Sequence, residues 1–125
     1  TLMACDYRIG VDGPFQLGLN EVQIGMTMHQ FGIELPRARL TPSYFQRSVN
    51  NAQMYSPAEA VEGGFLDKIV PAEELMAAAT AEAQRLAGLN MAAHTATKLK
   101  MRAGLLQTLD AAIEQDYQEN MALLN

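Results

Sequence analysis

The sequence predicts an α/β fold whose last part is helical. Two short runs, Tyr7–Val11 and Leu66–Val70, have the apolar pattern and the length typical of strands. Helix-start and helix-stop signals divide most of the remaining chain, and after Pro71 they leave only helices. At this length we expect one domain with a modest core, made of residues 1–70 and followed by a helical region over residues 71–125.

Between the first strand and the first strong helix signal, the expected elements are short. Asp12–Pro14 has the composition of a turn, and Phe15–Leu17 is expected to form a second strand after it. Gly25–Leu40 places apolar residues at roughly helical spacing, but Gly32 and Pro36 weaken a long helix. We therefore expect a loop and a broken helix in this segment.

Two helix starts follow in close succession. Thr41 before Pro42 is a strong start signal, because threonine accepts from a free backbone N–H and proline at the first helical position loses no hydrogen bond. We expect this helix to reach about Tyr55. Ser56 with Glu59 three residues later forms the pattern of a capping box, and the next pair of glycines is expected to end that second helix.

Pro71 opens a helix whose acidic first turn complements the positive end of the helix dipole. Its buried stripe is expected to consist of Leu75, Met76, Ala79, Ala83 and Leu86. Gly88 is expected to end it, and Gly104 to separate a helix over about Met91–Arg102 from a last helix.

The last helix is expected to begin at about Leu109 and to carry one apolar face. That face consists of Leu109, Ala112, Ile113, Tyr117, Met121 and Leu124. Either the core of the same protein or a subunit contact would cover it, and the sequence leaves both open.

Composition excludes several classes of function. The net charge is −5 and no basic cluster is interleaved with aromatic residues, so a nucleic-acid surface has no support. No apolar run is long enough for a bilayer and neither end resembles a signal peptide, which predicts a soluble, cytoplasmic protein without a membrane partner. The single cysteine, Cys5, is expected to be a small buried residue. Two histidines without ligand spacing predict no metal site, and His94 is interpreted as an ordinary helix residue.

Glu21 is the first candidate for chemistry. Its sequence neighbours Leu17, Leu19, Val22 and Ile24 predict an apolar setting, which disfavours the charged form of a carboxyl group. A carboxylate held in this way can take up and return a proton. The alternative is a surface glutamate after a tight turn.

Three runs of residues place Glu21 in a wider pattern. They are Cys5-Asp6-Tyr7-Arg8-Ile9, then Gly18-Leu19-Asn20-Glu21-Val22, then Ser56–Ala60 followed by Gly63–Pro71. In this order they resemble the crotonase superfamily, the enoyl-CoA hydratases and isomerases. The resemblance covers Thr1 to about Lys100 and implies the C-terminal portion of the ClpP/crotonase spiral fold.

The resemblance also implies what surrounds this chain. A crotonase-like subunit would have a further N-terminal half, which is missing here, and Thr1–Ala4 is interpreted as the end of a helix already under way. We expect an acyl-CoA substrate, no separate cofactor because coenzyme A is part of the substrate, and a homotrimer or hexamer. The helical region 71–125 would serve oligomerisation or cover the CoA site.

For activity, the resemblance implies an enolate held by two backbone N–H groups, with Glu21 moving a proton from C2 to C4 of a 3-enoyl-CoA. The Asn20-Glu21 pair resembles the isomerases. A hydratase needs a second carboxylate, which the family pattern places just before Thr1, so isomerase and hydratase both stay open. A member that has lost catalysis and only binds CoA or oligomerises is the alternative from another class.

The remaining candidates concern binding. Met28, His29 and Phe31 stand where hydratases carry a glycine-rich stretch, so they are expected to shape a different acyl pocket. His29 either faces the substrate or is a solvated loop residue. Lys98 shares a helix face with Arg102, and the resemblance makes Lys98 a candidate contact to the CoA phosphates; a solvated helix face is the alternative.

Overall fold

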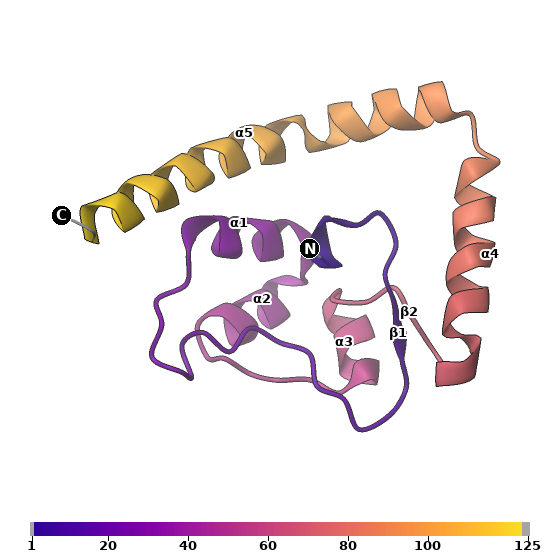
Figure 1. The fold of residues 1–125 in the computed structure, drawn as a ribbon, viewed down its shortest axis with the longest axis horizontal. Coiled ribbons are helices and arrows are strands. Elements are labelled where there is room, and N and C mark those ends of the chain that lie inside the picture. The colour runs from indigo at the N-terminus through magenta and orange to yellow at the C-terminus, as the bar shows by residue number, and fades with distance from the viewer. Residues whose placement is uncertain (1, 124–125) are drawn as a thin grey trace.

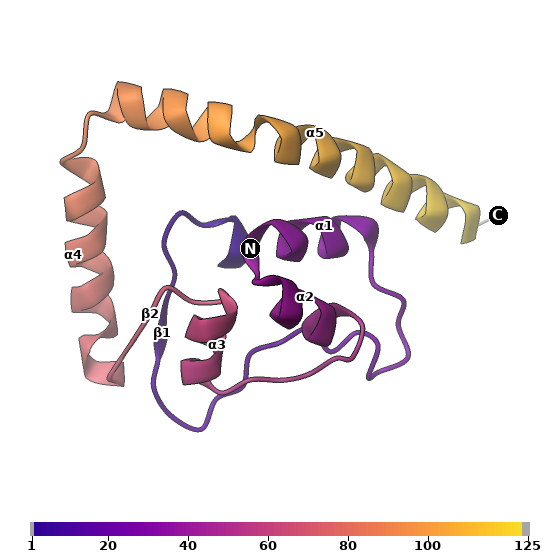
Figure 2. The same ribbon diagram turned by 180° about the vertical axis from the view of Figure 1, so that it is seen from behind.

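The computed structural model describes residues 2–123, and it confirms an α/β arrangement that ends in a long helix (Figure 1). The elements in chain order are η1 (Leu2–Ala4), β1 (Ile9–Val11), α1 (Gln30–Arg39), α2 (Pro42–Val49), α3 (Pro57–Gly63), β2 (Lys68–Val70), η2 (Ala72–Glu74), α4 (Leu75–Ala87) and α5 (Met91–Leu123). Helices α1, α2 and α3 gather on one side of the strand pair. Helix α4 stands on the other side, and α5 crosses above α1 (Figures 1 and 2).

The two predicted strands are present and pair with each other. β1 and β2 are parallel, with Ile9 opposite Lys68 and Val11 opposite Val70. The predicted strand over Phe15–Leu17 is wrong, because Leu17 forms only an isolated antiparallel bridge with Tyr55. Leu17 packs against the core, but Phe15 is 55% exposed, so a longer strand here would gain little from burial.

A small aromatic core lies between α2, α3 and the strands. Its buried members are Leu40, Tyr55, Ala60, Phe65 and Leu66. The rings of Tyr55 and Phe65 lie 5.8 Å apart between centroids and are tilted by 41°, a favourable arrangement for aromatic pairs. Leu17 and Leu19, from the loop before α1, pack against this core.

Arg8, directly before β1, and Asp67, directly before β2, form an ion pair. Arg8 is 6% exposed, and its Nε and Nη2 donate to the two carboxylate oxygens of Asp67 over 2.8 and 3.0 Å. Its Nη1 donates to the carbonyl of Gly64 over 2.7 Å. Burial raises the pKa of Asp67, but the hydrogen bonds and charge of Arg8 outweigh this and hold it below its ordinary value. The pair therefore fixes β1 against β2 with both charge and geometry.

The capping box at the start of α3 is confirmed. The backbone N–H of Glu59 donates to Ser56 Oγ over 3.4 Å, and the backbone N–H of Ser56 donates to Glu59 Oε2 over 2.9 Å. The helix ends as predicted, with Gly64 in the left-handed region at φ 89°. A side chain there would approach the carbonyl of Arg39 closely, so both conformation and space favour glycine.

Helix α2 begins at the predicted place, but other details differ. The Thr41 side chain makes no capping bond; its backbone N–H donates to the carbonyl of Gly63 instead. The helix ends at Val49 and not near Tyr55, because Ala52 adopts a left-handed conformation and Tyr55 turns to pair with Leu17.

Helix α1 was expected to be broken, and this prediction is wrong. It runs without interruption from Gln30 to Arg39, through Gly32 and Pro36. Pro36 is buried, and α1 makes its most extensive contact with α5. Tertiary packing along the helix therefore outweighs the local cost of the proline.

The predicted pattern of the last two helices is partly wrong. No residue of α4 is fully buried, and Met76, expected in the stripe, is 74% exposed. Helix α5 continues through Gly104, although a break was predicted there. Cys5 is exposed, contrary to the prediction that it is buried.

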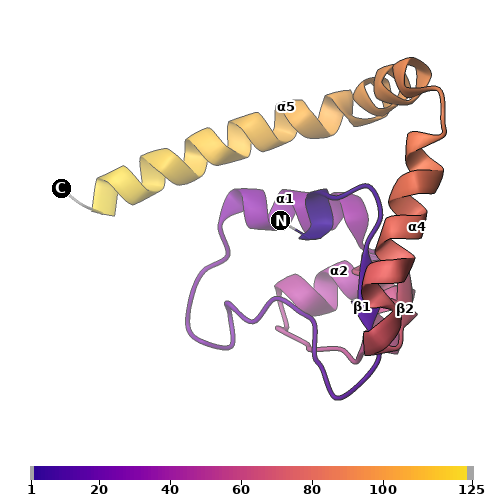
Figure 3. The ribbon, with the colours of Figure 1, turned by 45° about the vertical axis from the view of Figure 1, so that its right-hand side comes forward.

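The covered stripe of α5 also differs from the predicted one. The residues that are buried or half-buried along it are His94, Lys98, Arg102, Leu105, Leu109, Ala112 and Asp116. Ile113, Tyr117 and Met121 are exposed, and Leu124 lies outside the described residues. The stripe faces α1, over which α5 passes (Figure 3). The helix is thus rotated so that two small or charged residues, Ala112 and Asp116, take the closest positions.

The continuity of α5 predicts the effect of Gly104→Ala. A Cβ atom at this position would meet nothing within 4 Å, and alanine favours a helix interior. We expect the free energy of unfolding to rise by about 0.5–1 kcal/mol in urea denaturation. A fall in stability would contradict a helix that continues through residue 104.

The Arg8–Asp67 pair predicts a larger effect of the opposite sign. Asp67→Asn leaves a buried guanidinium without its charged partner, and we expect a loss of about 2–3 kcal/mol in the free energy of unfolding. Asp110→Asn, at an exposed position of α5, is the matched control and is expected to change stability by less than about 0.5 kcal/mol. Equal urea midpoints for the two variants would contradict the role of the pair.

Candidate active site

A cleft of about 410 Å³ opens between the loop that carries Glu21 and the first turns of α1. Its walls are mostly apolar. The loop side is lined by Leu17, Leu19 and Phe65, and the α1 side by Met28, Phe31 and Leu35. Because both walls are hydrophobic, the cleft is suited to bind an apolar group.

Backbone contacts on both sides of Glu21 fix its loop. Before it, Leu17 and Tyr55 exchange two backbone hydrogen bonds of 2.9 and 2.8 Å. After it, the backbone N–H of Met26 donates to the carbonyl of Glu21 over 2.8 Å. Gly18 lies so close to Met54 that a Cβ atom would approach Met54 Sδ to 2.5 Å. The loop therefore has little freedom to shift.

The predicted apolar setting of Glu21 is only half right. Leu17 and Leu19 line the cleft beside it, whereas Val22 and Ile24 are exposed. One carboxylate oxygen, Oε2, is buried and has no hydrogen-bond partner among the residues that the structure describes. Buried polar atoms without a partner are rare and costly, and they are often retained for chemistry. A carboxylate in this position can transfer a proton to or from a bound molecule.

The three predicted binding residues before and within α1 reach the same cleft. Met28, His29 and Phe31 all line it opposite Glu21. The rings of His29 and Phe31 are stacked at 6.2 Å with an interplanar angle of 9°, and both residues are exposed. The structure thus places His29 at the rim of the cleft, and its contact with a substrate stays a prediction.

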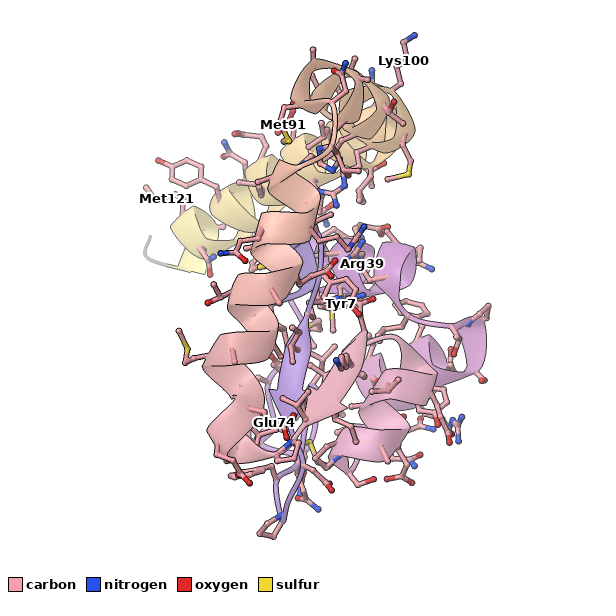
Figure 4. All side chains as sticks on the ribbon, turned by 90° about the vertical axis from the view of Figure 1, so that its right-hand side faces the viewer. Tyr7, Arg39, Glu74, Met91, Lys100 and Met121 are labelled. Carbon is pink, nitrogen blue, oxygen red and sulfur yellow. The ribbon has the colours of Figure 1, made fainter. Side chains whose placement is uncertain are left out.

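Lys98 lies apart from Glu21, in a second groove of about 560 Å³ between the segment before β1, the end of α4 and the first turns of α5. Its ammonium donates to Asp6 Oδ2 over 2.5 Å, and Arg102 Nη2 donates to Asp6 Oδ1 over 2.7 Å. The two cations share one helix face, as predicted, whereas Lys100 points away from the molecule (Figure 4). Asp6 belongs to the first motif run, so this ion pair ties α5 to the start of β1. Whether Lys98 also contacts a phosphate stays a prediction.

Sequence reasoning missed Asp116. Its carboxylate, 6% exposed, accepts hydrogen bonds from the backbone N–H groups of Gln30 over 2.6 Å and of Phe31 over 2.9 Å. These partners lie 86 and 85 residues away along the chain, so no local sequence motif indicates the contact. The available signal was the helical spacing of Leu109, Ala112 and Asp116, which puts a carboxylate on the covered stripe.

Other kinds of site are not found in the described part of the chain. Residues 2–123 contain no group of three or more histidine, cysteine, aspartate or glutamate side chains that could hold a metal ion. Within the same residues, no helix combines the length and the apolar character that a membrane span requires.

The structure is thus an α/β fold in which a glutamate lines a mostly apolar cleft. Residues 1–124 match the family described as "Enoyl-CoA hydratase/isomerase", and the chain belongs to this family. The predicted membership of the crotonase superfamily is therefore confirmed.

Known relatives agree with this assignment. An enoyl-CoA hydratase/isomerase family protein from Pseudomonas syringae superposes with a TM-score of 0.92 at 64% identity, over 94% of this chain and 51% of that one. An enoyl-CoA hydratase from Mycobacterium ulcerans superposes with a TM-score of 0.89 at 36% identity, over 94% and 51%. Human mitochondrial enoyl-CoA delta isomerase 1 is 26% identical over 98% of this chain and 41% of its own length. The chain thus spans about half, or less, of the length of these relatives.

The Asp6 cluster predicts a pH-dependent effect of Asp6→Asn. The hydrogen bond from Lys98, with the charges of Lys98 and Arg102, holds the pKa of Asp6 below its ordinary value despite partial burial. The ionised Asp6 carboxylate therefore stabilises the folded protein above the unfolded-state pKa of about 3.9. This contribution is lost as pH falls through the folded-state pKa.

We expect Asp6→Asn to lower stability by at most about 1 kcal/mol at neutral pH, because the pair is partly exposed. The difference from the unsubstituted protein should shrink as pH falls through the lowered folded-state pKa of Asp6 and disappear at an acid pH below it. Thermal unfolding at both pH values measures this, with Asp12→Asn as the control. A difference that persists in acid would show that the charge of Asp6 is not its source.

Proposed function

We propose that a complete subunit containing this chain moves the double bond of a 3-enoyl-CoA into conjugation, and that Glu21 transfers the proton. The observation that carries this proposal is the buried, unpartnered Oε2 of Glu21 in an apolar cleft. Family membership supports the substrate class, and the human relative is named as an enoyl-CoA delta isomerase.

The proposed reaction needs one carboxylate. Ionised Glu21 removes a proton from C2, and the electron pair of the C–H bond delocalises into the thioester carbonyl and the neighbouring double bond. The same carboxyl group then returns the proton at C4, which leaves the double bond between C2 and C3. The family resemblance implies two backbone N–H donors for the enolate oxygen, and we expect them to lie outside residues 2–123.

The Asn20-Glu21 pair, which resembles the isomerases, and the human relative named as a delta isomerase support isomerisation ahead of water addition. Among the described residues, Glu21 is the one carboxylate that lines the cleft, so this chain supplies the single group that isomerisation needs. Adding water requires a second carboxylate to position and deprotonate the water molecule, and the family pattern places that residue just before Thr1. Hydration is therefore the second candidate within the family, and a non-catalytic CoA-binding or oligomerisation subunit is the third.

The binding roles follow from the two grooves. Met28 and Phe31 would contact the acyl chain, with His29 at its edge, because they line the wall opposite Glu21. An ammonium has three N–H donors and Asp6 accepts from one of them, so we also propose that Lys98 contacts a phosphate of coenzyme A. No further cofactor is needed for a proton shift.

We propose a homotrimer or hexamer as the assembled form. Helix α5 exposes Leu99, Met101, Leu106, Ile113 and Tyr117, which is a large apolar surface for a helix in water. A subunit contact or the N-terminal half expected from the family resemblance would cover it.

The test of the proposed function is Glu21→Gln in the complete subunit. Glutamine keeps the size of the side chain and its hydrogen-bonding capacity but cannot accept the proton. We expect turnover of a 3-enoyl-CoA to fall by about 10³-fold or more, while the dissociation constant of a saturated acyl-CoA changes by less than about threefold.

Glu119→Gln is the matched control, because Glu119 lies on the exposed face of α5 and should leave turnover unchanged. Full turnover by the Glu21 variant would exclude Glu21 as the base. A subunit that binds acyl-CoA but shifts no double bond, with glutamate in place, would favour the non-catalytic alternative.

A further inference from the structure

The contact between α5 and α1 contains a buried carboxylate that the proposed reaction does not use. Asp116 Oδ1 accepts from the backbone N–H of Gln30 over 2.6 Å, and Oδ2 accepts from the backbone N–H of Phe31 over 2.9 Å. Both oxygens of one side chain are thus used by two consecutive backbone donors. The carboxylate is 6% exposed, so water competes little for these bonds.

These two donors are the first N–H groups of α1. The first turn of a helix leaves its N–H groups without partners inside the helix, and a side chain at the N-cap position usually accepts from one of them. Here the N-cap residue is His29, whose side chain makes no such bond. Asp116 therefore caps α1 from another helix, and it also places a negative charge at the positive end of the α1 dipole.

The capped turn is also a wall of the cleft. His29, Phe31, Gly32 and Leu35 line the cleft from this turn and the next, and Met28 precedes them. The side chain of Gln30 donates to Glu34, which holds it within α1. A shift of the first turn would consequently move Phe31 and His29 relative to Glu21.

We propose that Asp116 is a positioning residue for the substrate: it fixes the first turn of α1 and so sets the wall against which the acyl chain binds. This inference rests on the proposed function for the identity of the ligand. It connects the C-terminal helix to the wall of the cleft through the Asp116 side chain, which bonds the turn that lines it.

The chemistry of the contact favours a carboxylate over an amide. Two backbone donors need two acceptor oxygens, and an asparagine side chain offers one oxygen and an NH₂ group. Asp116→Asn therefore keeps the shape of the residue but leaves one buried N–H facing a donor. Such an unsatisfied donor is costly, so the first turn should loosen.

The experiment compares Asp116→Asn and Asp116→Ala with the unsubstituted complete subunit. The ligands are a short-chain and a long-chain saturated acyl-CoA, measured by titration calorimetry. We expect the dissociation constant of the long-chain ligand to rise about tenfold in Asp116→Asn, and that of the short-chain ligand to change by less than about twofold. Turnover at saturating 3-enoyl-CoA should stay within about threefold, because Glu21 is intact.

Hydrogen exchange supplies a readout that does not depend on any ligand. We expect the amides of residues 28–35 to exchange at least about tenfold faster in both Asp116 variants. Asp110→Asn, on an exposed position of the same helix, is the matched control and should exchange like the unsubstituted protein. If Asp116→Ala fails to fold, the binding and exchange measurements on Asp116→Asn alone test the inference.

Two results would overturn the inference. One is unchanged exchange of residues 28–35 in Asp116→Asn; the other is a dissociation constant that stays the same, or rises equally, for both chain lengths. Failure of the proposed reaction is distinguishable, because it would appear as absent turnover in the unsubstituted subunit while the binding and exchange measurements still report on Asp116.

Discussion

The ion pair between Arg8 and Asp67 is the interaction on which the rest of this chain depends. It joins the first and the last of the three motif runs, and its two residues are 59 positions apart along the chain. Because Arg8 is buried and also bonds Gly64, it fixes β1, β2 and the end of α3 as one unit. The loop that carries Glu21 leaves from β1, so its starting point is fixed, and the backbone bonds between Leu17 and Tyr55 hold it again before Glu21.

Helix α5 is held to that unit by charges on one continuous stripe. Near its start, Lys98 and Arg102 bond Asp6, which directly precedes the Tyr7-Arg8 pair. Further along, Asp116 bonds the first turn of α1. Apolar residues between these contacts bury surface against α1. The charged contacts fix the position of α5 along α1 and its orientation. The helix that covers α1 is thereby connected both to the strands and to the cleft wall.

The elements that depend on interactions between neighbouring residues could be predicted from the sequence. The capping box of Ser56 and Glu59, the start of α2 at Pro42 and the two paired strands follow from neighbouring residues, and they are present. Glycine and proline misled where packing overrides propensity, as in α1 and at Gly104 of α5. Glu21 could be proposed because a motif run carries it, and the α1 side of the cleft because it stands where hydratases carry a glycine-rich stretch. The helical spacing could place Asp116 on a covered stripe, but not its two partners, because they lie 86 and 85 residues away along the chain.

The central claim is that Glu21 moves a proton within an acyl-CoA and adds nothing to it. The most direct test incubates the complete subunit with a 3-enoyl-CoA and, separately, with a 2-enoyl-CoA, and identifies the products. The account predicts that the 3-enoyl-CoA becomes the conjugated 2-enoyl-CoA, and that the 2-enoyl-CoA gains no water. Accumulation of a hydroxyacyl-CoA would contradict it, because water addition requires a second carboxylate in the site.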